Sequence, residues 1–341
     1  MKKYFTPISI IIILVIFLIP ILSYSQMGDF EVENMFSDFN QLENVFLEIN
    51  PPFPAPNQTV KASVTSYTTD LKKQLITWML NDVKYREGIG LTHIDLELGN
   101  SGSRNVIKVI VTKQNLSEIQ AEKIITPQNL SIVAEAQTYV PAFYRGKALA
   151  SSQSNYKFIA VTDFKDQNGN KIPSKDLVFR WEINDKRDAE NSGPGKDTYY
   201  YTNNIISRPV RVVLEVSPLN SQNSAKTSRT FGFTDPIILF YESNPVFGTI
   251  LDRAIFGEIT MLTQELNIIS EPYFFEKNSI KNLKSEWFMD SKPVQTQNKN
   301  SLTLRRTDEK AGQVQISHKL SNPNMLMQYN NSNLLVKFNK Q

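Results

Sequence analysis

The chain has 341 residues, which predicts two or three domains at roughly 100 to 150 residues each. A hydrophobic content of 40% predicts packed cores, and a net charge of +3 with interspersed basic and acidic residues argues against nucleic-acid binding. Because cysteine is absent, disulfides, thiolate metal sites, a cysteine nucleophile and the acylated cysteine of a bacterial lipoprotein are excluded.

The N-terminal segment, residues 1–25, predicts export. Lys2 and Lys3 precede an apolar run whose centre reads ISIIIILVIFLIPIL, and small residues follow it. This order fits a secretory signal peptide. The alternative is an uncleaved anchor, because residues 4–22 would span about 28 Å as a helix at about 1.5 Å per residue. Both interpretations place the segment in the cytoplasmic membrane and the rest of the chain outside the cytoplasm, either anchored or secreted.

An acidic connector follows at residues 26–45. It contains five acidic residues and no Lys or Arg. Phe30, Met35, Phe39 and Leu42 give it some helical periodicity. We expect a short helix or a stalk that separates the membrane from the first domain.

Three tryptophans in the same local pattern define a repeat. They read LITWMLND around Trp78, LVFRWEIND around Trp181 and LKSEWFMDS around Trp287, at spacings of 103 and 106 residues. Repetition at one domain length predicts tandem copies of one unit. Turn-rich sequences at Thr126-Pro127-Gln128-Asn129 and Thr234-Asp235-Pro236 then set the predicted domains at residues 46–127, 128–234 and 235–341. Such short linkers predict a semi-rigid array.

Each unit contains six short runs of alternating apolar and polar residues. The clearest are NVIKVIVTK from Asn105, RPVRVVLEV from Arg208 and GQVQISHKL from Gly312. Alternation at period two, punctuated by Gly, Pro, Asn and Ser, is typical of antiparallel sandwiches, and a tryptophan on the third strand fits the Ig-like arrangement. We therefore predict an all-β chain of three tandem Ig-like β-sandwich domains, with little helix after residue 45. The predicted structural core centres on Trp78, Trp181 and Trp287.

The stretch VTDFKDQNGNKIPSKDLVFRWEIND resembles the second-to-third strand region of bacterial Ig-like surface modules. The segments PAFYRGKALAS, PIILFYESNP and EPYFF resemble those of exported cell-envelope proteins of small-genome bacteria. This resemblance covers most of residues 46–340 and implies tandem Ig-like or PKD-like repeats. It brings no activity and no site residues with it.

Motifs for catalysis and for cofactor binding are not found in the sequence. His93 and His318 lie in strand-like runs of different units, without an HExxH pattern. The run Gly99-Asn100-Ser101-Gly102-Ser103 has its second glycine one place too early for a nucleophile elbow, so we interpret it as a turn. We predict no catalytic residue, no cofactor and no metal site.

Calcium is the metal that the sequence comes nearest to supporting. Asp163, Asp166, Asn168, Asn170 and Asp176 offer oxygen ligands within one loop. An EF-hand alignment fails, because it places Phe164 at the first ligand position. An Asp/Asn-Gly turn between two strands is the commoner use of such a sequence.

Two segments are candidate interaction surfaces because aromatic residues and Arg are favoured at protein interfaces. Residues 139–147 carry aromatic and cationic side chains, and residues 244–262 form an apolar insertion in the third unit. The alternative is that they fold over their own sandwiches or pack on a neighbouring domain. The candidate surface residues are Tyr139, Phe143, Tyr144, Arg145, Val246, Phe247 and Ile250.

These observations predict a non-enzymatic, exported cell-envelope protein whose Ig-like units are spacers and protein-binding modules. Its expected partners are the cytoplasmic membrane, through the N-terminal segment, and a protein of the envelope. One alternative is an accessory component of a pilus or secretion apparatus. The other is a carbohydrate-active enzyme that uses paired carboxylates on a sandwich scaffold.

Overall fold

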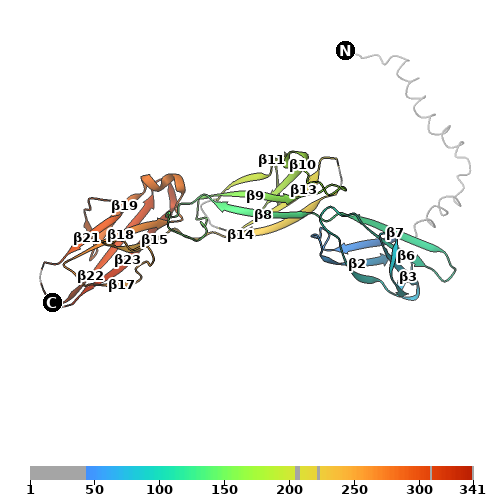
Figure 1. Cartoon of the computed structure of the whole chain (residues 1–341), viewed down its shortest axis with the longest axis horizontal. Coiled ribbons are helices and arrows are strands. Elements are labelled where there is room, and N and C mark those ends of the chain that lie inside the picture. The colour runs from blue at the N-terminus through green and yellow to red at the C-terminus, as the bar shows by residue number, and fades with distance from the viewer. Residues whose placement is uncertain (1–43, 204–207, 221–222, 308, 340–341) are drawn as a thin grey trace, which may run out of the picture. The chain divides into compact units, whose positions relative to one another are not determined.

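The computed structural model describes residues 44–203, 208–220, 223–307 and 309–339. Their regular secondary structure is almost entirely β-strand (Figure 1), and their helical elements are the short 3-10 turns η1 (Leu71–Lys73), η2 (Ser174–Asp176) and η3 (Lys277–Asn282). No helix in this part of the chain is long and apolar enough to cross a membrane. The predicted signal peptide or anchor, and nearly all of the acidic connector, lie outside the described residues.

Contacts divide the chain into two compact units. Among the described residues, the smaller unit holds 44–49, 62–94 and 106–123, and the larger unit holds 50–61, 95–105 and those from 124 to 339. The strands of the described residues form six sheets. This division does not test the three domain boundaries that the sequence predicts, which remain predictions.

The first seven strands form one three-stranded sheet, of order β1-β2-β5, and one four-stranded sheet, of order β4-β3-β6-β7. Within the smaller unit, β3 pairs antiparallel with both β4 and β6. The bounds are β1 Val45–Asn50, β2 Thr59–Ser66, β3 Leu75–Leu80, β4 Val83–Ile89, β5 His93–Glu97, β6 Asn105–Thr112 and β7 Glu118–Ile125.

The next seven strands repeat this arrangement, and we call them the middle sandwich. Its sheets have the orders β12-β9-β8 and β11-β10-β13-β14. The bounds are β8 Asn129–Ala136, β9 Asn155–Asp163, β10 Leu177–Ile183, β11 Lys186–Pro194, β12 Thr198–Thr202, β13 Val210–Pro218 and β14 Ala225–Phe231.

The remaining strands form the last sandwich, which keeps the same core order and adds two short strands. Its sheets are β16-β15-β18-β21 and β17-β23-β22-β19-β20, and β17 runs parallel to β23. The bounds are β15 Ile237–Asn244, β16 Gly248–Thr249, β17 Glu258–Met261, β18 Glu265–Tyr273, β19 Lys284–Met289, β20 Lys292–Val294, β21 Ser301–Arg305, β22 Gly312–Asn322 and β23 Met325–Phe338.

In each set of strands the first, second and fifth long strands share one sheet, while the fourth strand pairs with the third in the other sheet. This is the Ig-like sandwich architecture that fibronectin type III domains share. The predicted fold class, all-β with tandem Ig-like sandwiches, is therefore confirmed for the described residues.

The sequence prediction of six strands per unit was wrong: the first two sets have seven strands each, and the last sandwich has nine because it also contains β16 and β17. One strand was missed in all three. The missing strand follows the tryptophan strand directly: β4, β11 and β20. Most residues of these strands are exposed, so they carry no inward-facing apolar stripe. Without a buried face a strand shows no hydrophobic alternation, which is the signal that the prediction used.

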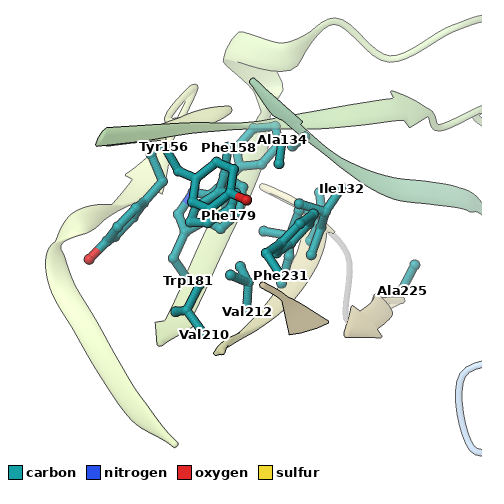
Figure 2. Packing of buried hydrophobic residues seen from close by; sticks show 14 of the residues in the cluster. Ile132, Ala134, Tyr156, Phe158, Phe179, Trp181, Val210, Val212, Ala225 and Phe231 are labelled. Atoms are coloured by element: carbon teal, nitrogen blue, oxygen red, sulfur yellow. The ribbon is translucent and has the colours of Figure 1, made fainter. Parts of the chain in front are cut away.

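The core of the middle sandwich forms around Trp181. This tryptophan is fully buried together with Phe158, Phe179, Val212 and Leu214. Figure 2 shows Trp181, Phe179 and Phe158 close together among the side chains of the core. Trp78 and Trp287, at 0% and 2% exposure, occupy the matching strands β3 and β19.

Each tryptophan donates its indole hydrogen to a main-chain carbonyl on the segment that leads to the fifth strand. The three Nε1 to O distances are 2.9 Å from Trp78 to Leu91, 2.9 Å from Trp181 to Lys196 and 3.0 Å from Trp287 to Lys299. A buried indole N–H without a partner would cost free energy, so this hydrogen bond lets a large ring fill the core.

A two-residue turn lies three residues after each tryptophan. Both of its residues have positive φ: 50° and 63° at Asn81 and Asp82, and 49° and 64° at Asn184 and Asp185. The equivalent pair in the last sandwich, Asp290 and Ser291, has φ of 46° and 66°. Positive φ at both central residues defines a type I′ hairpin turn, which accepts Asn and Asp more readily than other non-glycine residues.

The first turn residue also bonds to the sixth strand of its sandwich. The side-chain Oδ1 atoms accept main-chain N–H groups at 2.8 Å (Asn81 from Val106), 2.9 Å (Asn184 from Arg211) and 2.9 Å (Asp290 from Gln315). The main-chain N–H of the same first turn residue donates a second hydrogen bond, to the carbonyl of the same residue on the sixth strand. The turn therefore fixes the third strand to the sixth as well as to the fourth.

Replacing Asn184 with alanine should destabilise the protein by about 1 to 3 kcal/mol, because alanine disfavours positive φ and removes the bond to Arg211. Asn184→Gly keeps the backbone conformation and loses only the hydrogen bond, so its loss should be clearly smaller. Urea unfolding followed by tryptophan fluorescence measures both variants. Equal losses would show that positive φ does not select asparagine at this position.

Candidate functional site

The first predicted interaction segment, residues 139–147, packs against the last sandwich. Tyr139 exchanges two main-chain hydrogen bonds of 2.7 Å, donating to Phe275 and accepting from Phe274. The Phe143 ring lies edge-on to Tyr241 with centroids 5.4 Å apart, and the Tyr144 ring lies edge-on to Tyr273 at 5.3 Å.

These contacts occupy the aromatic side chains of the segment, while Ala142 and Lys147 remain exposed. Phe143 and Tyr144 are half-buried, whereas Arg145 is exposed. A Cβ on residue 146 would lie 2.3 Å from the ring of Tyr144. Glycine at this position therefore leaves room for the tyrosine ring. The aromatic side chains of this segment thus serve packing within the larger unit.

Buried polar side chains hold the same region together. Ser151 donates from Oγ to the carbonyl of Phe274 at 2.6 Å. Gln328, which is fully buried, donates to the carbonyl of Ser152 at 3.0 Å and accepts from the N–H of Glu276 at 2.9 Å. Sequence reasoning missed these residues, because a polar residue in an alternating strand gives no sign of which face it occupies until the register is known.

The second predicted segment, residues 244–262, presents large apolar side chains to solvent. Val246 is 82% exposed, Phe247 84%, Phe256 73% and Leu262 79%. Ile250 is half-buried. We call these five residues the insertion surface. Four large apolar side chains this exposed within 19 residues make the segment a candidate interaction site.

The insertion is held in place at several points. Asn244 Oδ1 accepts the N–H groups of Val246 at 2.8 Å and Phe247 at 3.1 Å, which fixes the turn that carries both side chains. Ile255 donates its N–H to Phe240 at 2.7 Å, and Glu258 pairs with Lys337. The exposed rings are therefore presented by an ordered segment, which lowers the entropic cost of binding.

A cavity of about 450 Å³ adjoins the insertion surface. Ile250, Phe256 and Leu262 line it together with Arg253 and Glu258. Ala254, Ile255 and Ile259 add apolar surface to the lining, while Glu242, Thr260 and Thr263 add polar groups, so the cavity is mixed in character.

The two histidines occupy opposite environments. His93 is exposed on β5, whereas His318 on β22 is fully buried. The His318 ring stacks on Trp287 with centroids 4.0 Å apart and an interplanar angle of 10°. Its Nε2 lies 2.8 Å from Ser285 Oγ.

The Ser285 and His318 pair is not arranged for nucleophilic catalysis. Ser285 donates its hydroxyl hydrogen to the carbonyl of Lys299 at 2.6 Å, so Nε2 of His318 must be the donor to Ser285. A serine nucleophile needs the reverse direction, with a third group on Nδ1. Among the described residues, Nδ1 of His318 has no hydrogen-bond partner.

In the loop of the middle sandwich that was considered for calcium, residues 163–176, the Asp166 carboxylate accepts hydrogen bonds from the loop itself. Asp166 Oδ1 accepts the N–H groups of Asn168 at 2.9 Å and Asn170 at 2.8 Å, and these bonds lower the pKa of Asp166. Asp163 lies 4.0 Å from Lys165 Nζ. No group of three or more His, Cys, Asp or Glu suited to a metal occurs in the part of the chain that the structure describes.

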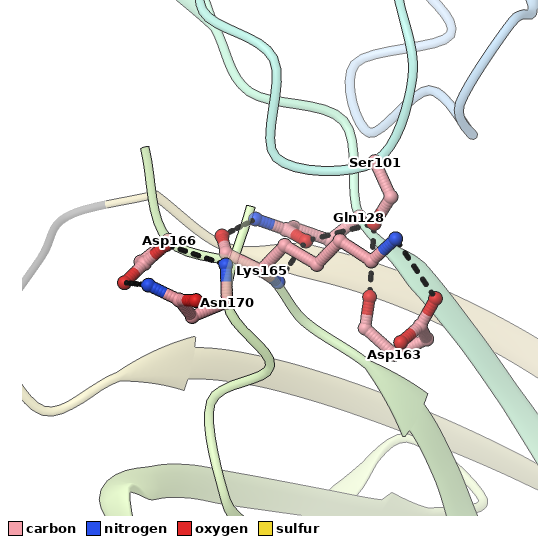
Figure 3. Close-up of polar contacts among 6 residues, drawn as sticks. All are labelled: Ser101, Gln128, Asp163, Lys165, Asp166 and Asn170. Carbon is pink, nitrogen blue, oxygen red and sulfur yellow. Dashed lines mark hydrogen bonds and ion pairs between the residues drawn. The ribbon is translucent and has the colours of Figure 1, made fainter. Parts of the chain in front are cut away.

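Figure 3 shows the polar contacts that surround this loop. Gln128, in the predicted linker, donates from Nε2 to the carbonyl of Lys165 at 2.9 Å and accepts from its N–H at 3.0 Å. Ser101 donates to the carbonyl of Asp163 at 2.9 Å. The loop therefore has a structural role in fixing the residues around Gln128.

No protein-family model matches the chain, and no curated protein matches it. Solved structures with a similar course of the chain include the three N-terminal domains of the Highly Immunogenic Outer Capsid protein of bacteriophage RB49, at 10% identity over 88% of this chain and 99% of that one, with a TM-score of 0.23.

Two further arrays are similar in the same way. The central fibronectin-III array of RIM-binding protein is 13% identical over 85% of this chain and 95% of that one, with a TM-score of 0.28. Sidekick-1 immunoglobulin domains 1–4 are 10% identical over 87% and 99%, with a TM-score of 0.20. Because these scores are far below 0.5, the assignment to tandem Ig-like sandwiches rests on the strand order of this chain.

The stability of the protein should fall at acid pH partly through His318. Burial lowers the pKa of its imidazole from 6.5 to about 4. Between these values the unfolded chain binds a proton that the folded chain does not, so the contribution is complete above pH 6.5 and is lost toward pH 4. The loss amounts to about 3 kcal/mol at about 1.4 kcal/mol per pKa unit.

The variant His318→Leu should flatten the pH dependence of urea unfolding between pH 6.5 and 4. Leucine fits because Leu214 takes the equivalent place opposite Trp181. His93→Leu removes the exposed ring and should leave the profile unchanged. Parallel profiles for the wild type and His318→Leu would contradict the account.

Proposed function

We propose that the protein is a non-enzymatic, exported binding protein of the bacterial cell envelope, in which the sandwiches space and present the insertion surface to a protein partner. The observation that carries this proposal is the exposure of Val246, Phe247, Phe256 and Leu262 on an ordered segment. When a partner covers such apolar side chains, water is released, and binding gains a free energy of roughly 25 cal/mol per Å² of apolar surface buried.

Tandem Ig-like sandwiches are typical of binding and spacer modules, which supports the class of function. The export step rests on the two lysines and the apolar run at the N-terminus. The non-enzymatic part is supported by the Ser285 hydroxyl, whose hydrogen is committed to a carbonyl. Residues 139–147 contribute less than the sequence suggested, because their aromatic rings already pack within the chain.

Photo-crosslinking in the cell that makes the protein tests this proposal. A photoreactive phenylalanine derivative at position 247 should give a discrete product with one partner. The matched control is position 200, because Tyr200 is another exposed aromatic residue, at 67%, on β12. Val246→Ser should reduce crosslinking from position 247, since Val246 is 82% exposed on the same Asn244 turn and its loss does not touch the core.

The same products from positions 247 and 200 would mark random collisions. Absence of any product from position 247 would show that the insertion surface has no partner. Either outcome would overturn the proposal.

A further inference from the structure

A second cavity, distinct from the insertion surface, opens into the last sandwich. Its volume is about 240 Å³. β18 supplies Ser270 and Glu271, β22 supplies His318, and Lys281 and Lys299 come from the segments next to β19 and β21. We call it the His318 cleft.

The His318 cleft contains a residue type that the other two sandwiches do not have at the position opposite the core tryptophan. The residue opposite the core tryptophan is Val109 in the first set of strands and Leu214 in the middle sandwich. In the last sandwich it is His318. The same register accepts an apolar side chain twice, so packing alone does not require an imidazole here.

Two fully buried side chains that line the cleft have unused polar atoms. His318 Nδ1 and Ser270 Oγ each have no hydrogen-bond partner among the described residues. Because Nε2 of His318 carries the hydrogen toward Ser285, Nδ1 offers a lone pair and needs a donor. A buried polar atom left unpaired costs about 1 to 3 kcal/mol, and such atoms in native structures are normally paired.

The chemistry of the cleft favours a ligand whose groups both donate and accept hydrogen bonds. Nδ1 requires a donor, and the Ser270 hydroxyl can play either part. Glu271 adds an acceptor to the lining, while Lys281 and Lys299 add donors. A hydroxyl group meets all of these needs, whereas a fully deprotonated anion such as sulfate offers no donor to Nδ1.

The volume and the apolar lining of the cleft also favour a hydroxylated ligand. Its volume of about 240 Å³ exceeds the roughly 30 Å³ that one water takes in the liquid. Ile280, Leu283 and Leu320 add apolar surface, which suits the carbon faces of a ring. We propose that the His318 cleft binds a small neutral polyhydroxyl molecule, of the size of one sugar ring, through His318 Nδ1 and Ser270.

Nitrogen NMR of the imidazole rings tests the proposal, because the chain has two histidines and the exposed one serves as an internal control. The full chain is labelled with ¹⁵N-histidine, kept soluble in a zwitterionic detergent without sugar, and titrated with glucose, galactose, N-acetylglucosamine and myo-inositol. At least one of them should shift the Nδ1 signal of His318 saturably, while the signals of His93 stay in place.

Two variants separate binding from folding. His318→Leu should abolish saturable binding measured by calorimetry while keeping the fold, because leucine occupies this register in the middle sandwich. Ser270→Ala should weaken binding several-fold and leave the His318 resonances of the free protein nearly unchanged.

Three results would overturn the proposal. The first is that none of the four compounds shifts His318. The second is that His93 shifts in parallel with His318, which would indicate a solvent effect. The third is that inorganic phosphate shifts the His318 signal saturably while no polyhydroxyl compound does, which would make the cleft an anion site served by its lysines.

Discussion

The hydrogen bond from a buried tryptophan indole to a main-chain carbonyl is the interaction on which the rest of each sandwich depends. It occurs three times with nearly the same length, at Trp78, Trp181 and Trp287. The ring fills the space between the sheets, and the bond ties the third strand to the segment before the fifth. The type I′ turn that follows then ties the third strand to the sixth. Ring and turn together hold three non-consecutive segments in register.

The sequence reveals the strands that have a buried face and does not reveal those that are mostly exposed. The run from Gly312 alternates cleanly, because one face of β22 is buried. The run from Arg208 alternates less cleanly, because Val213 and Ser217 on the other face of β13 are buried as well. The strands β4, β11 and β20 escaped prediction since solvent covers most of their residues. The type I′ turns were present in the sequence as Asn81-Asp82 and Asn184-Asp185, but their positive φ was recognised only in the structure.

The candidate sites divide in the same way. Val246 and Phe247 are exposed in a longer, more apolar insertion, and that length was visible in the sequence. Phe143 and Tyr144 look similar in sequence, yet they contact Tyr241 and Tyr273, which lie about 100 residues or more further along the chain. The alternation of side chains along β22 would by itself have placed His318 in the core, because it lies two residues after the buried Ile316. What this alternation does not give is its contact with Ser285, which depends on the register between β19 and β22.

Hydrogen exchange of the three indole N–H groups tests whether these bonds hold the sandwiches together. In the ¹⁵N-tryptophan spectrum of the full chain we expect three indole signals, all exchanging far more slowly than a free indole because each bond must open with its core. One indole that exchanges at the free rate while its sandwich stays folded would contradict the claim, since the ring would then fill the core without the bond that holds the strands together.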